Sequence, residues 1–517
     1  MEKVENKTEQ FCLDIVNLPL NRHRPLANLV MSLCGCTTAK SVVELSESDF
    51  FHYHYSNLPK ILNDIARTAS DSLALDRLIR SLLIPYLAPI RTECGLSFYG
   101  FSTDVTKLLK AHSPTLEGRG YVPIANNVIA SNQSIGVGYR VSMTHLNALE
   151  KGADGWCPPM VVQRLSVEDD AIDVGVAQIQ SLLTDTTLPF SSSLCLEKAD
   201  MGYAHASFLS PLYALENLVC LVRFRPSSKV WQQMFTNSEQ TPDSINSVPL
   251  QGAPAIYGKK WYLTDTSQDK IYTRKGEKYT VWQDSIMDLP PSDTVEVAST
   301  LKNGRQITIL LTRWNDLLKR TKEGHSMKDK PFDIVRVLVI DAKTGDKVFD
   351  RPLFIAVSGQ RKQEIPTPLV QTQYRERSDV EGVYRFGKHN MLLDKLQTPD
   401  VNHLDNWLKI WMLSVWLLFT ARQQTPLTVK VWEKYLPINK AKAEQTNPVL
   451  TMPQVRKGIN NLFATFDKTP FLPRKYKKGK GRQKGEKQPK RKRFSPTKKM
   501  KKVKKIKNIK LKCQKNE

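Results

Sequence analysis

The chain has 517 residues, which exceeds the size of one compact domain and indicates roughly two to four folded units. Its formal net charge of +25 is concentrated near the C-terminus. Residues 474–517 hold 22 Lys and Arg against two acids, so they carry 22 − 2 = +20 and leave 25 − 20 = +5 for the rest. Such a polycation is typical of proteins that bind phosphate backbones, with membranes and ribosomes as alternative partners.

Cysteine spacing and hydropathy exclude several classes of protein. The eight cysteines form no C-x-x-C pair, which argues against a zinc site, and Cys34-Gly-Cys36 is interpreted as two buried thiols in a reducing compartment. The polar N-terminus predicts no signal peptide. The most apolar run, 407–419, is too short to span a bilayer and contains Lys409, so it predicts a buried helix.

Helical periodicity dominates the first part of the chain, and strands follow. Apolar spacings of three and four, as in 61–65 and 73–83, predict helices from about residue 20 to 92. Beyond Gly95 we predict strands at 96–101, 135–142, 160–165, 193–196 and 217–224, with helices at 171–183 and 208–216. Three strands, a helix, a strand, a helix and a strand is the order of the ribonuclease H fold, although other α/β domains share it.

A turn-rich region from 226 to 365 separates this part from later helices. Strand-like runs such as 307–311 and 334–340 predict a β-rich insertion there. Helical periodicity returns at 374–422 and again at 455–466. The Lys-, Gly- and Pro-rich segment after Pro473 is expected to be disordered without a partner.

Tyr374, Arg377, Glu381 and Lys388 share one face of a predicted helix. At about 100° per residue, their offsets of 0, 3, 7 and 14 fall within about 60° of one another. A carboxylate flanked by two cations and a phenol suits a site that handles phosphates and a metal together. The alternative is a solvated helix with ion pairs.

The same four residues match Y-x2-R-x3-E-x6-K, the signature of a large group of bacterial insertion-sequence transposases with a DDE triad. The chain resembles this family from about residue 90 to 470. Further similarity to a subgroup lies in Arg385-Phe-Gly-Lys388, Gln397-Thr-Pro-Asp400 and Asn406-Trp407.

The resemblance implies a catalytic triad of Asp104, Asp200 and Glu381. Asp104 ends the first predicted strand of the core, and Asp200 begins Asp-Met-Gly-Tyr203, which is similar to the D-x-G-Y element of the family. The 381 − 200 = 181 residues before Glu381 include the β-rich insertion, which the family places at this point. Taken alone, each aspartate would be a turn or capping residue. Glu197 is expected to point away from Asp200 by strand alternation.

By resemblance, the triad holds two Mg²⁺ ions, for which Mn²⁺ can substitute. Asp104 would bridge both ions, with Asp200 and Glu381 on one each. The implied reactions are hydrolysis at transposon ends and 3′-OH attack on target DNA. The implied partners are end DNA, target DNA and a second copy of the chain. No membrane or small-molecule cofactor is expected, and the implied location is the bacterial cytoplasm at the nucleoid.

Candidate DNA contacts surround the triad. The resemblance assigns Tyr374, Arg377 and Lys388 to transposon-end phosphates, and Arg385 is a further candidate. The family's Pro/Arg element after the first Asp is replaced here by a run with Lys107, which either supplies a basic contact or marks divergence. Arg119 either contacts DNA or forms a salt bridge within its loop. Stacking on a flipped base has three candidates, each of which could instead pack the insertion, namely Trp261, Trp282 and Trp314.

These interpretations divide the chain into six parts. They are a helical DNA-binding domain (1–92), the first part of a ribonuclease H-like catalytic core (93–225), the β-rich insertion (226–365), the last core helices (366–425), a C-terminal helical region (426–472) and a disordered basic tail (473–517). Alternatives are a domesticated, non-cutting DNA-binding protein, a ribonuclease H-like nuclease, and an RNA- or ribosome-associated protein.

Overall fold

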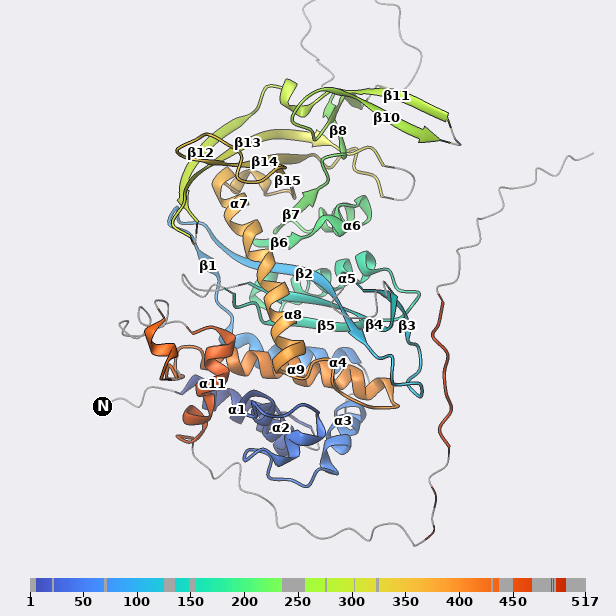
Figure 1. Cartoon of the computed structure of the whole chain (residues 1–517), viewed down its shortest axis with the longest axis vertical. Helices are drawn as coiled ribbons and strands as arrows, with labels where there is room; N and C mark the ends of the chain where they lie inside the picture. Colours follow the sequence, from blue (N-terminus) through green and yellow to red (C-terminus); the bar gives the residue numbers. More distant parts are fainter. Residues whose placement is uncertain are drawn as a thin grey trace, which may run out of the picture.

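The computed structural model describes most of the chain (Figure 1). The described residues are 6–20, 23–68, 72–124, 135–147, 155–234, 256–274, 277–301, 303–321, 325–428, 431–436, 450–466, 485, 487 and 490–498. None of the helices among them is long and apolar enough to cross a membrane.

A mixed sheet of 13 strands runs through the described part of the molecule. Its main path is β3-β4-β2-β6-β7-β15-β14-β13-β8-β9, with β1, β5 and β12 pairing to β2, β4 and β13. The strands are β1 (Ile90–Arg91), β2 (Ser97–Leu109), β3 (Gly120–Pro123), β4 (Ile135–Leu146), β5 (Pro159–Leu165), β6 (Cys195–Ala199), β7 (Leu218–Phe224), β8 (Lys229–Gln233), β9 (Tyr257–Tyr262), β12 (Asp293–Thr300), β13 (Gln306–Leu318), β14 (Phe332–Asp341) and β15 (Leu353–Ser358). A separate hairpin consists of β10 (Gln268–Arg274) and β11 (Glu277–Gln283).

The part of the sheet that carries the candidate site has the order β5-β4-β2-β6-β7. Strands β2, β6 and β7 are parallel to one another, whereas β4 is antiparallel to both β2 and β5. Helices α5 (Ala171–Leu183) and α6 (Ala206–Leu212) pack beside these strands. The predicted mixed α/β class is therefore confirmed, and the helix expected at 171–183 is present with these bounds.

The strands of the predicted insertion continue the central sheet. The first of them along the sheet, β15, pairs antiparallel with β7, with Ala356 opposite Val222. Strands β14 and β13 follow, with a bulge between Trp314 and Leu317. Pairing with β15 satisfies backbone groups of β7 that would otherwise form an exposed sheet edge.

The remaining helices lie toward the two ends of the chain. They are α1 (Lys7–Val16), α2 (His23–Gly35), α3 (Asn57–Thr68), α4 (Ser72–Leu83), α7 (Thr367–Arg375), α8 (Asp379–Asn390), α9 (Val401–Ala421) and α11 (Met452–Phe463). The short 3₁₀ helices are η1 (Val43–Glu47), η2 (Ile84–Tyr86), η3 (Pro189–Ser191), η4 (Met201–Tyr203), η5 (Ile286–Asp288), η6 (Lys362–Glu364), η7 (Glu376–Ser378) and η8 (Glu433–Tyr435).

Helix α9 is central to the helical part of the molecule. Its apolar run at 407–419 is buried throughout, which confirms the predicted buried helix. Helices α1, α2, α3 and α11 pack on α9, and its other side contacts β5. The N-terminal helices, expected to form a domain of their own, therefore share one hydrophobic core with α9 and the sheet.

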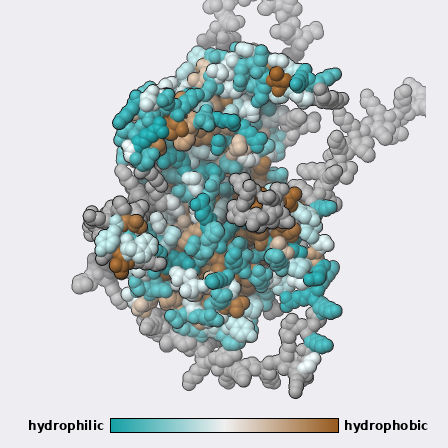
Figure 2. Space-filling model, in the orientation of Figure 1, coloured by the Kyte–Doolittle hydropathy of each residue, from teal (hydrophilic) through white to brown (hydrophobic). Residues whose placement is uncertain are grey.

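Two apolar cores lie on the sheet. The larger joins the helical part to α5, α6 and the adjoining strands. The smaller lies under α7 and includes Leu196, Leu221, Val370 and Tyr374. On the face seen in Figure 2, hydrophilic side chains predominate and hydrophobic ones appear in scattered patches.

Part of the C-terminal tail has a defined place in the fold, which corrects the expectation of a disordered tail for residues 490–498. This segment lies beside β3, where Thr497 forms a parallel bridge with Gly120. Two of its backbone N–H groups, those of Phe494 and Thr497, donate to carbonyls on the body of the protein. The remaining tail residues of that prediction lie largely outside the described residues.

Candidate active site

Two aspartates and an arginine follow one another across three parallel strands. Asp200 directly follows β6 and Arg223 lies near the end of β7, whereas β2 continues to Leu109 instead of ending at Asp104 as predicted. Thr103 of β2 pairs with Ala199 of β6, so the next positions, Asp104 and Asp200, are neighbours across the sheet. Adjacent strands are about 4.8 Å apart. The pairing of Ala199 with Val222 likewise brings Arg223 beside Asp200. The register of the neighbouring strands therefore brings together residues that are far apart in sequence.

A helical run formed by α7, η7 and α8 crosses this row. The buried Lys198 of β6 holds this helical run on the sheet. The Lys198 Nζ lies 2.9 Å from Glu376 Oε2 and 3.1 Å from Gln373 Oε1. Asn147 adds a hydrogen bond to the Glu376 carbonyl. Strand alternation puts Lys198 and Asp200 on the same face of β6, so both face the helical run.

The predicted single helix from Tyr374 to Lys388 is interrupted by a 3₁₀ turn. Tyr374 lies near the end of α7, Arg377 in η7, and Glu381 and Lys388 in α8. The turn is right-handed and continues the helical direction, with Ser378 at φ −64° and ψ −18°. The shared face inferred from an ideal α-helix is therefore only approximate.

Arg377 links two of the three predicted triad members. Its Nη1 is 3.6 Å from Asp104 Oδ2, and its Nη2 donates to Glu381 Oε1 at 3.1 Å. The Arg377 side chain is 17% exposed, whereas Glu381 is 58% exposed. Asp200 lies close enough to raise the pKa of both Arg377 and Asp104 by its charge. The structure thus brings all three predicted carboxylates around one guanidinium.

The surroundings of Asp104 shift its pKa strongly. Burial raises its pKa to about 6, and the charges of Asp200 and Glu381 act in the same direction. The hydrogen bond from Val105 N–H and the charge of Arg377 oppose that shift. A nearby cation strongly stabilises the ionised form of a carboxyl group that is desolvated and surrounded by like charge.

Asp200 is held by its own turn. Its carboxylate caps η4, and Oδ1 accepts a hydrogen bond from Gly202 N–H at 2.7 Å. An ideal Cβ at Gly202 would lie 2.9 Å from that oxygen, so the close approach requires glycine. The Asp-x-Gly spacing therefore fixes the orientation of this carboxylate.

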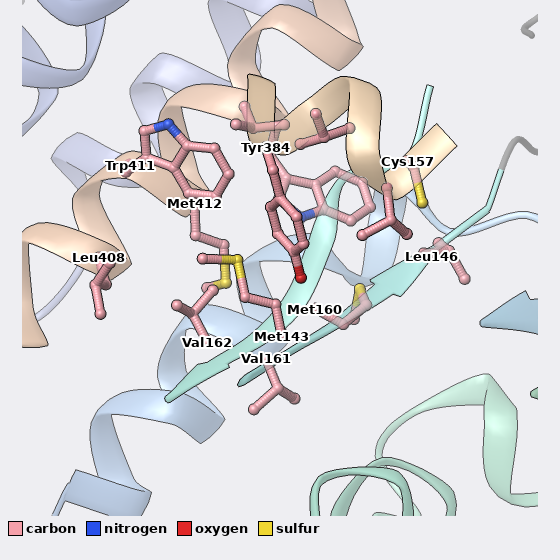
Figure 3. Close-up of a cluster of buried hydrophobic side chains, with 14 of the residues drawn as sticks. Met143, Leu146, Cys157, Met160, Val161, Val162, Tyr384, Leu408, Trp411 and Met412 are labelled. Atoms are coloured by element: carbon pink, nitrogen blue, oxygen red, sulfur yellow. The ribbon is translucent and has the colours of Figure 1, made fainter. Parts of the chain in front are cut away.

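Three tyrosines enclose the acids. Burial raises the pKa of Tyr374 to about 12, with Arg377 opposing the shift. Tyr384 reaches from α8 to donate a hydrogen bond to the Asp104 carbonyl at 3.0 Å. Figure 3 shows Tyr384 among Met143, Met160 and Met412. Tyr203 is buried behind the strand ends, where burial and then Asp104, Asp200 and Glu197 raise the pKa of its phenol.

Three basic residues predicted to contact DNA lie on α8 and β2, namely Lys388, Arg385 and Lys107. Burial lowers the pKa of Lys388, and the charge of Lys107 adds to that shift, so the two ammonium groups are near one another. Lys107 is half-buried and Arg385 is exposed one turn after Glu381. Lys107 and Lys388 are therefore neighbours, and Arg385 follows Glu381 along α8.

Arg119 has a structural position, which corrects its predicted contact with DNA. It is 4% exposed, and its guanidinium donates to the carbonyls of Lys110, Ala111, Leu116 and Phe494. With its donors directed at these carbonyls, Arg119 fastens its loop and the tail instead of facing a ligand. Trp261 and Trp314 are likewise buried in the insertion, whereas Trp282 is 56% exposed on β11.

Sequence reasoning missed a group of arginines beside the site. A hollow of about 1060 Å³ lies between α7 and the insertion strands, with an apolar floor that includes Ile309 and Val337. Three exposed arginines lie at this hollow, namely Arg223, Arg351 and Arg375. The only sequence signal for Arg223 was its position near the end of a predicted buried strand, whereas its place beside Asp200 follows from the register of β6 and β7.

The donor set of the site is compatible with hard divalent cations. Three carboxylates and one guanidinium sum to −3 + 1 = −2 when ionised, and all potential ligands are oxygens. Within the described ranges no three acidic, His or Cys side chains already form a metal cage, and Arg377 lies between Asp104 and Glu381. A cation would therefore require the exposed Glu381 to release Arg377.

A scan against models of protein families finds no match for the chain, and a search among curated proteins finds no similar sequence.

Proposed function

We propose that this protein is a DNA transposase that hydrolyses transposon ends and joins their 3′-OH groups to target DNA. The observation that carries this proposal is the group of Asp104, Asp200 and Glu381 around Arg377. Two of these acids leave adjoining parallel strands, and the third lies one helical turn beyond the arginine.

The fold supports the proposal through its order of elements. We infer a ribonuclease H-like catalytic core, in which β2, β4 and β5 are followed by α5, β6, α6 and β7. Helices α7 and α8 return to the same strands after the insertion and bring Glu381 to the two aspartates.

Asp104, Asp200 and Glu381 would hold two Mg²⁺ ions, or Mn²⁺ in their place. When bound, such a pair supplies activation of the attacking oxygen and charge stabilisation of the leaving oxygen. Oxygen-only ligands suit this role, and a bound cation would offset the like charge of Asp200 and Glu381 at Asp104.

The other residues of the site would bind the DNA backbone. Arg377 is held by Asp104 and Glu381 and can grip a phosphate in a fork, with Tyr374 buried beside it. Lys107, Lys388 and Arg385 continue the positive charge along α8, so a duplex would lie along that helix.

The proposed reaction also implies partners. Two transposon ends must be held together, which implies a homodimer in the complex with DNA. The implied location is the nucleoid of a bacterial cytoplasm.

The decisive experiment is cleavage of a duplex that carries the inverted repeat flanking the gene, in Mg²⁺. We expect Glu381→Gln to reduce cleavage at least about 100-fold, because losing a metal ligand removes several kcal/mol of transition-state stabilisation. Glu296→Gln, an exposed acid of β12, is the matched control and should cut normally.

Equal cutting by the wild type and Glu381→Gln would overturn the triad assignment. Binding of end DNA without cleavage by the wild type would favour a domesticated DNA-binding protein. Cleavage without joining, at sites unrelated to the repeat, would favour a ribonuclease H-like nuclease.

A further inference from the structure

The segment 490–498 is attached to the outer edge of the sheet by its main chain. Thr497 N–H donates to the Arg119 carbonyl at 2.7 Å, and Phe494 N–H donates to the Pro114 carbonyl at 2.8 Å. Thr497 also forms a parallel bridge with Gly120, the first residue of β3. The segment thus lies against the loop before β3 and the first residue of β3, whose other side pairs with β4 (Figure 1).

A buried cation completes this attachment. Arg119 Nη2 donates to the Phe494 carbonyl at 2.8 Å, while Nε and Nη1 donate to carbonyls of the loop at 110–116. If the segment left, a buried donor would lose its acceptor, which costs about 1–3 kcal/mol unless water replaces it. The loop is therefore built to hold an extended chain.

The contacts leave the cations of the segment exposed, although the Lys492 ammonium also lies 5.1 Å from the centroid of the Phe494 ring. Phe494 and Pro496 are half-buried, and their neighbours Ser495 and Thr497 are exposed, as expected when alternate residues of a strand face the protein. The basic side chains on either side, at 490–493 and 498, are all exposed. Docking therefore uses the backbone and two apolar side chains, and positions a row of cations on the surface.

This row lies at a defined distance from the carboxylates. Gly120 pairs with Gly138, which pairs with Leu109 of β2, five positions beyond Asp104. Five residues along a strand and three strand intervals across, the last from Gly120 to Thr497, correspond to about 22 Å. Backbone phosphates of one DNA strand are about 3.4 Å apart along the axis, so this distance equals roughly six nucleotides.

We propose that residues 490–498 form a docked cationic strand that binds the DNA backbone about six nucleotides from the phosphate at the carboxylate site. The inference rests on the proposed function for its ligand. Docking fixes these cations before DNA arrives, so less conformational freedom is lost on binding than with a free tail.

The test uses two proline substitutions in the full-length protein. Thr497→Pro removes the N–H that donates to Arg119, whereas Ser495→Pro alters a neighbouring exposed residue whose N–H makes no backbone hydrogen bond within the described residues. Both variants keep every charge. Hydrogen exchange of the Phe494 amide reports docking, and binding to a 30-base-pair duplex without Mg²⁺ reports DNA contact.

We expect Thr497→Pro to lose protection of the Phe494 amide and to bind the duplex about three- to tenfold more weakly. Ser495→Pro should keep its protection and bind within about twofold of the wild type. Equal exchange in the two variants would overturn docking, and unequal exchange with equal affinity would overturn the DNA contact. Neither measurement requires cleavage, so the docked strand is tested independently of the cleavage experiment that tests the transposase proposal.

Discussion

At the scale of single residues, a second carboxyl group lies directly behind the candidate site. Glu197 of β6 is fully buried on the face of the strand opposite Asp200, and its Oε1 accepts a hydrogen bond from Thr103 N–H at 2.9 Å. Thr103 directly precedes Asp104, so this bond connects β6 to the point of β2 where the aspartate projects. Burial raises the pKa of Glu197 to about 8, against the opposing effects of Thr103 and Lys198.

The raised pKa predicts a specific dependence of stability on pH. The folded protein keeps the Glu197 proton up to about pH 8, whereas the unfolded chain loses it near 4.5. The folded state therefore binds more protons in this interval, and the free energy of unfolding should fall as pH rises through it. Glu197→Gln keeps a neutral side chain with an acceptor oxygen, so it should flatten this slope in urea denaturation at pH 5, 6.5 and 8.

The exposed Glu296→Gln is the control and should keep the slope of the wild type. An unchanged slope in Glu197→Gln would show that the buried carboxyl does not hold its proton in the folded state.

At the scale of elements, the approach of α8 to α9 decides where Glu381 lies. An ideal Cβ at Gly387 would be 2.6 Å from Trp411 Cζ2, so the two helices touch at this glycine. Trp411 is fully buried and cannot move without disturbing the core around α9. Helical periodicity indicates neither this contact nor the 3₁₀ turn at 376–378, because both depend on the partner surface.

Two glycines on α8 allow a matched comparison. Gly387→Ala should lower the free energy of unfolding by about 1–2 kcal/mol, because overpacking outweighs the better helix propensity of alanine. Gly382→Ala has no neighbouring heavy atom within 4 Å of its Cβ and should raise that free energy by up to about 1 kcal/mol. Chemical denaturation measures both, and equal effects would contradict the proposed helix contact.

At the scale of the whole molecule, most of the net positive charge lies in the C-terminal tail and little of it in the folded body. The body carries +5 and contains the carboxylate group, while residues 474–517 carry +20. Only 490–498 of the described tail touches the body, through backbone contacts that leave its cations exposed. The tail can therefore contribute to DNA affinity without reshaping the core.

Deletion of 474–517 should change DNA binding far more than folding. It removes 22 Lys and Arg, and each lost phosphate contact reduces the slope of log K against log salt by about 0.9. We expect a clearly shallower slope for a random duplex, with only a small drop in the thermal midpoint from the lost Phe494 acceptor of Arg119. Thr497→Pro keeps all charges and should retain most of the slope, whereas an unchanged slope after deletion would assign DNA binding to the body alone.

Local sequence patterns determined the elements of the core and the order of its acids. Alternation and helical periodicity predicted the strands around Asp104 and the helix at 171–183, because an element with one buried face has apolar residues at regular spacing. The same alternation predicted that Glu197 turns away from Asp200. The spacing from Tyr374 to Lys388 predicted the grouping of Arg377 with Glu381.

The tertiary structure alone decided which segments meet. Periodicity shows that a strand is buried but does not identify its partner, so neither the pairing of β15 with β7 nor the neighbourhood of Arg223 and Asp200 was predicted. Arg119 looked like a contact for DNA until the fold buried it against carbonyls, including that of Phe494. Such pairings depend on backbone groups and register between distant residues, which leave little trace in side-chain identity.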